Sequence, residues 1–264
     1  MTARAQQIET LAQVLDDAAR QARPVPQPSG SMTLDLASAY AVQAALLARR
    51  HARGETPAGV KLGFTSRAKA EQMGVHEVIL GRLTDAMQVA DGGVLDRSAL
   101  IHPRVEPEVA FLLGAELVPG AEPDALAAAV ASVASALEVI DSRYTDFRFR
   151  LGDVVADNTS AAAYVIGPWQ DPCDLVDRDV RLEVDGELVD TGSTTAILGD
   201  PWNALAEAAR MAGRLGLRLG AGDVLLAGAA TAAAPLPGSG LVTGVVHGLA
   251  QVTVRVGSGR PRGA

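Results

Sequence analysis

The sequence predicts an α+β protein with a strand-rich core and helices at its N-terminus. Two early stretches, residues 6–20 and 36–53, carry apolar side chains at helical spacing. From Gly59 onward, short apolar runs are separated by glycine, proline and aspartate, which is typical of strands and turns. Helical stretches do not alternate regularly with these runs, so a doubly wound parallel sheet is not expected. We expect a helical segment over residues 1–55 and one compact β-rich unit over 56–264.

The two N-terminal helices are expected to cap the rest of the chain. In the first helix, Ile8, Leu11 and Leu15 fall on one side. In the second, Tyr40 and Leu46 point inward in the same way. The proline-rich stretch RPVPQPSGS lies between them and predicts a connector.

The β-rich part is expected to combine strands with three further helices. Strands are predicted over residues 101–113, 137–140, 164–166, 180–184, 224–226 and 242–246. Helices are predicted over 66–73, over the alanine-rich stretch 123–136 and over 202–215. The DGELV segment around Gly186 has the sequence of a hairpin turn.

Composition and charge argue against several classes of protein. The net charge of -8 disfavours nucleic acid as a partner. The long uncharged run 224–254 is broken by Pro235, Pro237 and glycines, so it favours buried strands over a membrane span. The charged, amphipathic start has no apolar signal core. Cys173 is the single cysteine, which excludes an intrachain disulfide and suits a reducing compartment. We expect a cytoplasmic protein.

Three glutamates are the candidates for chemistry. Glu106 and Glu108 lie two apart in a predicted strand, which places both side chains on one face. Like charges at the entrance of a buried strand resist desolvation unless a cation neutralises them. The spacing alone equally allows a solvated strand end. Glu138 is flanked by apolar residues in ALEVIDSRY, and its alternatives are a helix cap or a salt bridge with Arg143.

Four segments together resemble a known enzyme family. GVKLGFTSRAKAEQMGV, HPRVEPEVAFLL, EVIDSRYTDFRF and DVVADNTSAAAYVIG are similar to the 2-keto-4-pentenoate hydratases and 4-oxalocrotonate decarboxylases of the fumarylacetoacetate hydrolase superfamily. The resemblance extends over roughly residues 35–230. It implies that superfamily's mixed β-core and a Mg²⁺ or Mn²⁺ ion held by Glu106, Glu108 and Glu138. Carboxylate oxygens are hard ligands that suit those cations better than zinc.

The resemblance also implies roles for residues around the cation. Lys61 is expected to act catalytically, close to the developing enolate or the substrate carboxylate. Without the resemblance, a lysine on a strand is more often a solvated edge charge. Asn158 and Ser160 are expected to line the substrate pocket, although turn and capping chemistry is their ordinary role. Thr231 is expected to replace a family threonine where this chain has Ala227.

Two positions favour a decarboxylase within this family. Hydratase-like sequences carry an aspartate where this chain has Ile79, and tend to have a tryptophan in place of Phe147. A dry apolar wall at Ile79 fits the loss of CO₂ from 2-oxohex-3-enedioate, a small unsaturated 2-keto dicarboxylic acid, to give 2-hydroxypenta-2,4-dienoate. Arg143 or Arg148 could orient the distal carboxylate of that substrate.

Several alternatives stay open from the sequence. The chain could be a 2-keto-4-pentenoate hydratase or an inactive partner subunit in a complex with a hydratase. Acylpyruvate hydrolysis would need a dyad such as His51 with Glu55. Departures from the family pattern at Ala250 and Gln251 bear on the exact substrate. The resemblance further implies a homo-oligomer.

Overall fold

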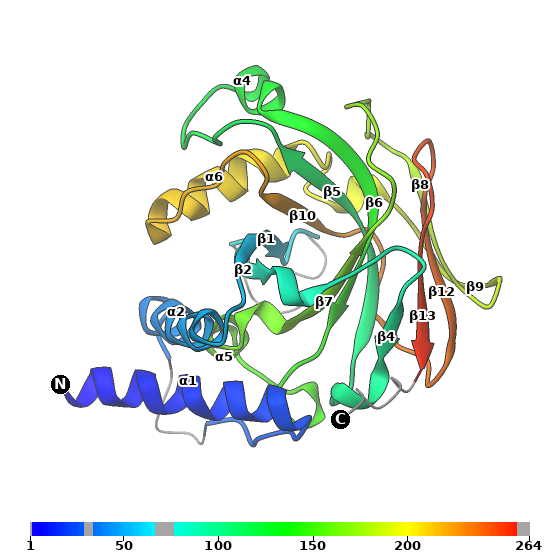
Figure 1. Ribbon diagram of the computed structural model, residues 1–264. Coiled ribbons are helices and arrows are strands. Elements are labelled where there is room, and N and C mark those ends of the chain that lie inside the picture. The colour runs from blue at the N-terminus through cyan, green and yellow to red at the C-terminus, as the bar shows by residue number, and fades with distance from the viewer. Residues whose placement is uncertain (1, 29–33, 67–76, 258–264) are drawn as a thin grey trace.

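The computed structural model describes residues 2–28, 34–66 and 77–257, and within them two sheets form the centre of the molecule (Figure 1). The larger sheet has the order β2-β1-β10-β5-β6-β7-β3, with β11 also paired to β5. Its strands are β1 (Pro57–Gly63), β2 (Ile79–Thr84), β3 (Gln88–Val89), β5 (Arg104–Leu113), β6 (Val130–Ile140), β7 (Ala161–Ile166), β10 (Val224–Ala229) and β11 (Ala234–Pro235).

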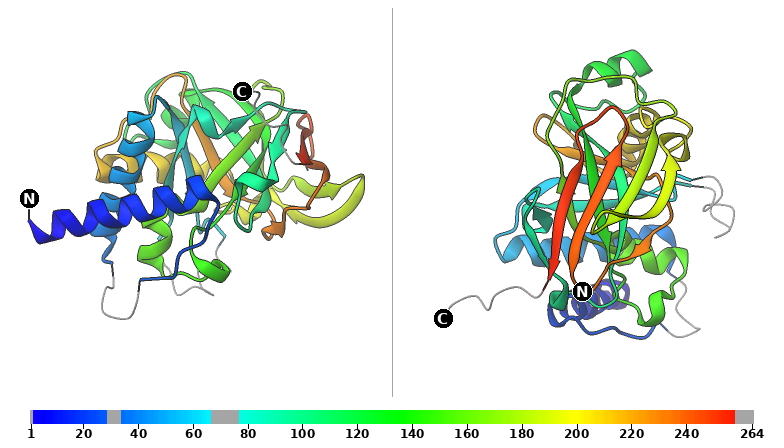
Figure 2. Two further views of the ribbon diagram at one scale, coloured as in Figure 1. Left: turned by 60° about the horizontal axis from the view of Figure 1, so that its bottom comes forward. Right: turned by 90° about the vertical axis from the view of Figure 1, so that its right-hand side faces the viewer.

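A five-stranded sheet covers one face of the larger one. Its order is β4-β13-β12-β8-β9, built from β4 (Val94–Asp96), β8 (Asp179–Val184), β9 (Glu187–Ser193), β12 (Gly240–Val246) and β13 (Val252–Gly257). The right-hand view of Figure 2 shows these strands in front of the larger sheet. Leu137 and Val139 of β6 pack there with Val242 and Val254, so alternate residues of β6 supply the core between the sheets.

Helices close the remaining sides. α1 (Ala3–Gln21) and α2 (Leu36–Ala52) lie beside the short α5 (Leu151–Ala156) in Figure 1. Asp16 of α1 is buried and bonds Arg53, just after α2, at 2.7 Å, which joins the two N-terminal helices. α6 (Asn203–Leu215) packs on the larger sheet, and the small α4 (Pro123–Ala128) precedes β6.

The predicted α+β class with N-terminal helices is confirmed, and so are the helices near residues 6–20, 36–53 and 202–215. The hairpin at Gly186 joins β8 to β9. The helix expected over 66–73 lies mostly outside the described residues. None of the described helices is long and apolar enough to cross a membrane.

The helix predicted over 123–136 is wrong beyond Ala128. The chain enters β6 at Val130, and Ala134 and Ala136 become fully buried strand residues in one cluster with Tyr164. Alanine favours a helix by only a few tenths of a kcal/mol over most residues, about as much as one packing contact. Pairing with β5 and β7 on both sides therefore overrides the local preference.

Candidate metal centre

The β5–β6 pair brings the three predicted glutamates together. Glu106 is directly opposite Glu138 in the antiparallel register, and Glu108 lies two positions further along β5. Paired residues and residues two apart share one face of a sheet, so all three carboxylates point to the same side. Oxygen atoms of the three groups lie within 4.8 Å of one another. The predicted grouping of Glu106, Glu108 and Glu138 is thus present in the structure.

All three carboxylates are withdrawn from solvent. The exposed fractions are 8% for Glu106, 0% for Glu108 and 1% for Glu138. Desolvation raises the pKa of Glu108 well above its ordinary value, and the charges of Glu138 and Glu106 add to the effect. Desolvation also raises the pKa of Glu138. Burial and mutual repulsion therefore make the ionised form of these carboxylates unfavourable in the absence of a cation.

One carboxylate oxygen of this cluster has neither a hydrogen bond nor an ion pair to any residue that the structure describes. Glu108 Oε2 accepts a hydrogen bond from the Gly228 N–H at 2.8 Å, whereas the buried Glu108 Oε1 accepts none. A buried carboxylate oxygen without a donor is costly, unless a cation binds it. The three carboxylates are hard oxygen donors within reach of a single ion, so the residues fit Mg²⁺ or Mn²⁺.

Lys61 supplies a positive charge at the edge of the cluster. Its Nζ lies 2.9 and 3.0 Å from the two carboxylate oxygens of Glu138, and the residue is 3% exposed. Gly81 lies opposite Lys61 in the β1–β2 register. A Cβ at Gly81 would come within 3.2 Å of Lys61 Cγ and 2.9 Å of the Asn158 carbonyl oxygen, so the glycine leaves room for both. The alternative of a salt bridge between Glu138 and Arg143 is not what the structure shows, because Lys61 pairs with Glu138 and Arg143 pairs with Asp157.

A small pocket opens beside the acids. Its volume is about 110 Å³, and Lys61, Glu106, Ile79 and Ser160 line it together. The remaining walls are mostly apolar, with Ile140 and the aromatic rings of Phe64, Phe147 and Phe149 among them. Four of the predicted site residues thus share one pocket with mainly apolar surroundings, which strengthens every electrostatic interaction inside it.

Arg143 does not reach this pocket in the way the sequence suggested. Its guanidinium is buried and bonds the carboxylate and the carbonyl of Asp157, the carbonyl of Asp141 and the carbonyl of Ala161. Arg143 is absent from the described lining of the pocket. A guanidinium with four protein acceptors is held in place by the fold, so orienting a substrate carboxylate is not the role this geometry supports.

Asn158 and Thr231 also have partners within the protein. The Asn158 amide accepts from the Arg82 N–H at 2.8 Å and donates to the Arg82 carbonyl at 2.9 Å. It therefore ties the edge strand β2 to the turn before β7. Thr231, buried just after β10, donates to the Ala232 carbonyl at 3.0 Å. Neither side chain lines the pocket.

The turn that carries Ser160 has a strained backbone. Asn158, Thr159 and Ser160 adopt φ values of 50°, 55° and 58° in succession. Each such residue other than glycine costs on the order of 1 kcal/mol, and strain of this kind gathers at functional sites. Phe64 and Phe147, both at φ 57°, line the same pocket. Sequence reasoning missed Thr159 and Phe64, because no local pattern predicts a left-handed threonine or phenylalanine.

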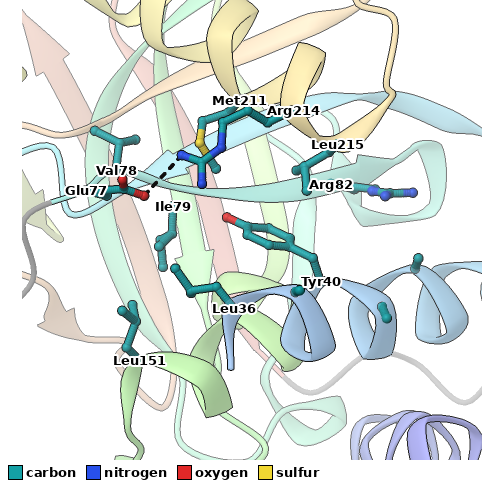
Figure 3. Close-up of a pocket in the computed structure, with 13 residues that line it drawn as sticks. Leu36, Tyr40, Glu77, Val78, Ile79, Arg82, Leu151, Met211, Arg214 and Leu215 are labelled. Atoms are coloured by element: carbon teal, nitrogen blue, oxygen red, sulfur yellow. Dashed lines mark hydrogen bonds and ion pairs between the residues drawn. The ribbon is translucent and has the colours of Figure 1, made fainter. Parts of the chain in front are cut away.

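A second, larger cavity of about 460 Å³ shares Ile79 with the acidic pocket (Figure 3). It lies between α2, β2 and α6, where Tyr40 Oη accepts from the Leu80 N–H at 3.1 Å and Arg214 pairs with Glu77 at 3.2 Å. Ile79 therefore lies between the two cavities, and its apolar side chain lines both of them.

The His51–Glu55 dyad is absent. His51 Nδ1 contacts the Glu55 backbone carbonyl at 3.0 Å, whereas the Glu55 carboxylate bonds Arg50 at 2.7 Å and the Thr84 hydroxyl at 2.7 Å. An imidazole without a carboxylate partner lacks the arrangement of a general base dyad. Neither residue lines the acidic pocket in the part of the chain that the structure describes.

Comparisons with known proteins show the family to which the chain belongs. Residues 58–257 match the family model described as fumarylacetoacetate (FAA) hydrolase C-terminal. A 4-oxalocrotonate decarboxylase from a Pseudomonas species is 47% identical over 230 residues, 87% of this chain and 90% of the relative. A 2-hydroxyhexa-2,4-dienoate hydratase from Comamonas testosteroni is 34% identical over 257 residues, 94% of this chain and 97% of the relative.

The same comparison holds in three dimensions. The solved structure of the 4-oxalocrotonate decarboxylase from Pseudomonas putida G7, complexed with magnesium and adipate, has a TM-score of 0.91 and 36% identity. The alignment covers 97% of this chain and 98% of that one.

Proposed function

The chain belongs to the fumarylacetoacetate hydrolase superfamily, in the family of 2-keto-4-pentenoate hydratases and 4-oxalocrotonate decarboxylases, and we propose on that premise that it is a divalent-cation-dependent 4-oxalocrotonate decarboxylase. One observation carries the proposal. Three buried glutamates converge within 4.8 Å beside a pocket whose wall at residue 79 is isoleucine, not an acid.

Glu106, Glu108 and Glu138 would hold the cation, Mg²⁺ or Mn²⁺. A magnesium ion is present in the complex of the Pseudomonas putida G7 relative, which supports the first of these. When bound, such a cation supplies a Lewis acid that polarises the 2-keto oxygen of the substrate.

The reaction balances without an added oxidant or base. The C5–C6 bond of 2-oxohex-3-enedioate breaks, and its electron pair moves through C4 and C3 to the 2-keto oxygen. C6 leaves as CO₂, and the enolate oxygen takes up one proton to give 2-hydroxypenta-2,4-dienoate. The Lys61 ammonium, held at the pocket wall by Glu138, stabilises the negative charge that develops on that oxygen.

The apolar walls favour decarboxylation over hydration. Adding water to the dienoate calls for a group that activates water, and Ile79 provides none. Ile79, Ile140 and Phe149 exclude water from the conjugated part of the substrate, so that water does not add to the dienoate. Replacing Ile79 with aspartate would place a proton-handling group on this wall.

The test is an assay of magnesium-loaded protein with 2-oxohex-3-enedioate. The proposal expects CO₂ release that stops when EDTA removes the cation, and no hydration of 2-hydroxypenta-2,4-dienoate. Hydration of the dienoate without any CO₂ release would assign the chain to the hydratases instead. Cation binding without turnover, relieved only by an added hydratase, would make it the silent partner subunit. Light scattering of the same sample reports whether the chain forms the expected homo-oligomer.

A further inference from the structure

The proposed substrate carries a second anionic group, and the inference developed here rests on the proposed function. In 2-oxohex-3-enedioate the C6 carboxylate lies four bonds from the 2-keto carbon. A carboxylate in an apolar pocket needs a cation or hydrogen-bond donors to be bound well. Among the described residues that line the pocket, Lys61 is the one positive charge, and Glu138 already holds it at 2.9 Å.

Two other arginines near the site, Arg143 and Arg82, are not among the described residues that line the pocket. Arg143 is bonded by Asp157 and three backbone carbonyls, and Arg82 lines two different hollows. Arg104 differs from both in its contacts. Within the described residues its guanidinium pairs with no carboxylate, and its carbon atom lies 5.0 Å from the centroid of the Phe147 ring.

Arg104 is placed by the same register that places the acids. It lies on β5 two residues before Glu106, so its side chain leaves the sheet on the same face. It is opposite Ile140 of β6, as Glu106 is opposite Glu138. Ile140, Glu106 and Phe147 all line the pocket. Arg104 is not one of the described residues that line the pocket, but its guanidinium lies over the ring of Phe147, which does line it. The arginine is therefore placed just beyond the pocket, along the two strands from the pair of glutamates.

The stacking on Phe147 prepares Arg104 for a carboxylate. A guanidinium that lies over an aromatic face keeps its N–H edge free. That edge matches the two oxygens of a carboxylate. Arg104 is exposed at the rim, so it is accessible to a ligand that enters from solvent.

The length of the substrate matches the spacing of the strand positions. Two residues along a strand advance about 6.7 Å. A six-carbon chain separates its terminal carboxylate carbons by about 6 Å at ordinary bond lengths. With the 2-keto acid end beside Glu106 and Glu138, the far carboxylate falls beside Arg104 and Ile140.

We propose that Arg104 selects the dicarboxylic substrate by binding the carboxylate that is later lost as CO₂. This ion pair stabilises the bound substrate and weakens as C6 becomes neutral, so it lowers KM and does not raise kcat. Because the guanidinium is at a solvent-exposed rim, the expected contribution to affinity is about fivefold to tenfold.

The experiment compares two saturated 2-keto acids that the enzyme cannot decarboxylate by this route. 2-Oxoadipate and 2-oxohexanoate have the same chain length and differ in the distal carboxylate alone. Calorimetry on magnesium-loaded wild-type protein is expected to show about fivefold to tenfold tighter binding of 2-oxoadipate. Arg104→Gln brings the ratio close to one by weakening 2-oxoadipate alone, and Arg104→Lys restores part of it.

Arg148→Gln is the matched control. The sequence also offers Arg148 for the distal carboxylate, but Arg148 is exposed and is not one of the described residues that line the pocket, and it is Arg104 that lies over the Phe147 ring. Replacement of Arg148 is therefore expected to keep the wild-type ratio. A ratio unchanged in Arg104→Gln, or lost in Arg148→Gln, would overturn the assignment of Arg104. Equal weakening of both ligands by Arg104→Gln would also overturn it, because that result indicates a structural role.

The binding experiment on Arg104 can succeed or fail independently of the decarboxylation assay. The binding ratio requires no turnover, so it can support Arg104 even where CO₂ release fails. If the protein decarboxylates 2-oxohex-3-enedioate, Arg104→Gln is further expected to raise KM about fivefold to tenfold without lowering kcat.

Discussion

Replacing Glu108 with glutamine is expected to stabilise the protein without its cation and to destabilise it relative to wild type when the cation is present. Glutamine keeps an acceptor for the Gly228 N–H and removes one buried charge. Among the described residues, Glu108 faces the carboxylates of Glu106 and Glu138 and the ammonium of Lys61, so the repulsion exceeds the attraction by about one charge. Two charges about 5 Å apart interact with about 3 kcal/mol at an effective dielectric of about 20.

The effect depends on pH with a defined sign. The folded-state pKa of Glu108 is raised above 4.5, so the folded cation-free protein binds more protons than the unfolded chain. Its free energy of unfolding therefore falls as pH rises above about 4.5, by up to about 1.4 kcal/mol per pH unit, until the raised pKa is passed. Glu108→Gln removes this loss, and at pH 8 it is expected to gain about 2 kcal/mol over wild type.

Thermal unfolding measures both halves of the prediction. In EDTA at pH 8 the Tm of Glu108→Gln is expected to exceed that of wild type by about 4–6 °C. Saturation with Mg²⁺ at 100 times its Kd stabilises wild type by about 2.7 kcal/mol, and the variant hardly responds. The order of the two Tm values thus reverses between the two buffers. A variant that is less stable than wild type in EDTA at both pH 6 and pH 8 would refute the idea that repulsion dominates the empty cluster.

Three further predictions concern the same centre. Lys61→Gln is expected to lower kcat about 100-fold while the Kd for Mg²⁺, measured by calorimetry, does not weaken, because the lysine repels the cation and its charge serves the reaction. Binding of Mg²⁺ is expected to release protons near neutral pH, since a cation lowers the raised pKa of Glu108; identical binding enthalpies in buffers of different ionisation enthalpy would contradict this. Asn158→Ala removes the side-chain partner of the Arg82 N–H and carbonyl. It is expected to lower the free energy of unfolding, measured in urea, by about 2–4 kcal/mol. A decrease below about 0.5 kcal/mol would show that other contacts hold β2 in place.

The sequence allowed the acidic residues to be found but not the geometry that joins them. Alternation along β5 predicts that Glu106 and Glu108 share a face. The pairing of Glu106 with Glu138 depends on the register between strands 32 residues apart in sequence, which no local pattern determines. The resemblance to the family supplied Glu138 as a ligand, and the register explains why it can be one.

Contacts distant along the chain explain what local patterns could not predict. Arg143 is predicted to bind a substrate carboxylate, but its guanidinium bonds the Asp157 carboxylate and three backbone carbonyls, two of which lie 14 and 18 residues away in sequence. The helix predicted up to residue 136 gave way to strand β6 because both of its neighbours pair with it. Local propensities are worth tenths of a kcal/mol, whereas these tertiary contacts are worth several.

Curvature of the larger sheet is what makes the centre possible. Lys61 on β1 and Glu138 on β6 are separated by β10 and β5, so three interstrand spacings, about 14 Å in a flat sheet, lie between their backbones. Their side chains nevertheless meet at 2.9 Å, which requires the sheet to curl around the acids. The Asn158 amide bonds to Arg82, holding the edge strand β2 against the turn before β7, at the opposite side of that curl. The turn at 158–160 thus stabilises the curvature that brings Lys61 and the carboxylates to one concave face. Its strained backbone lies beside the site, where a fixed geometry is needed.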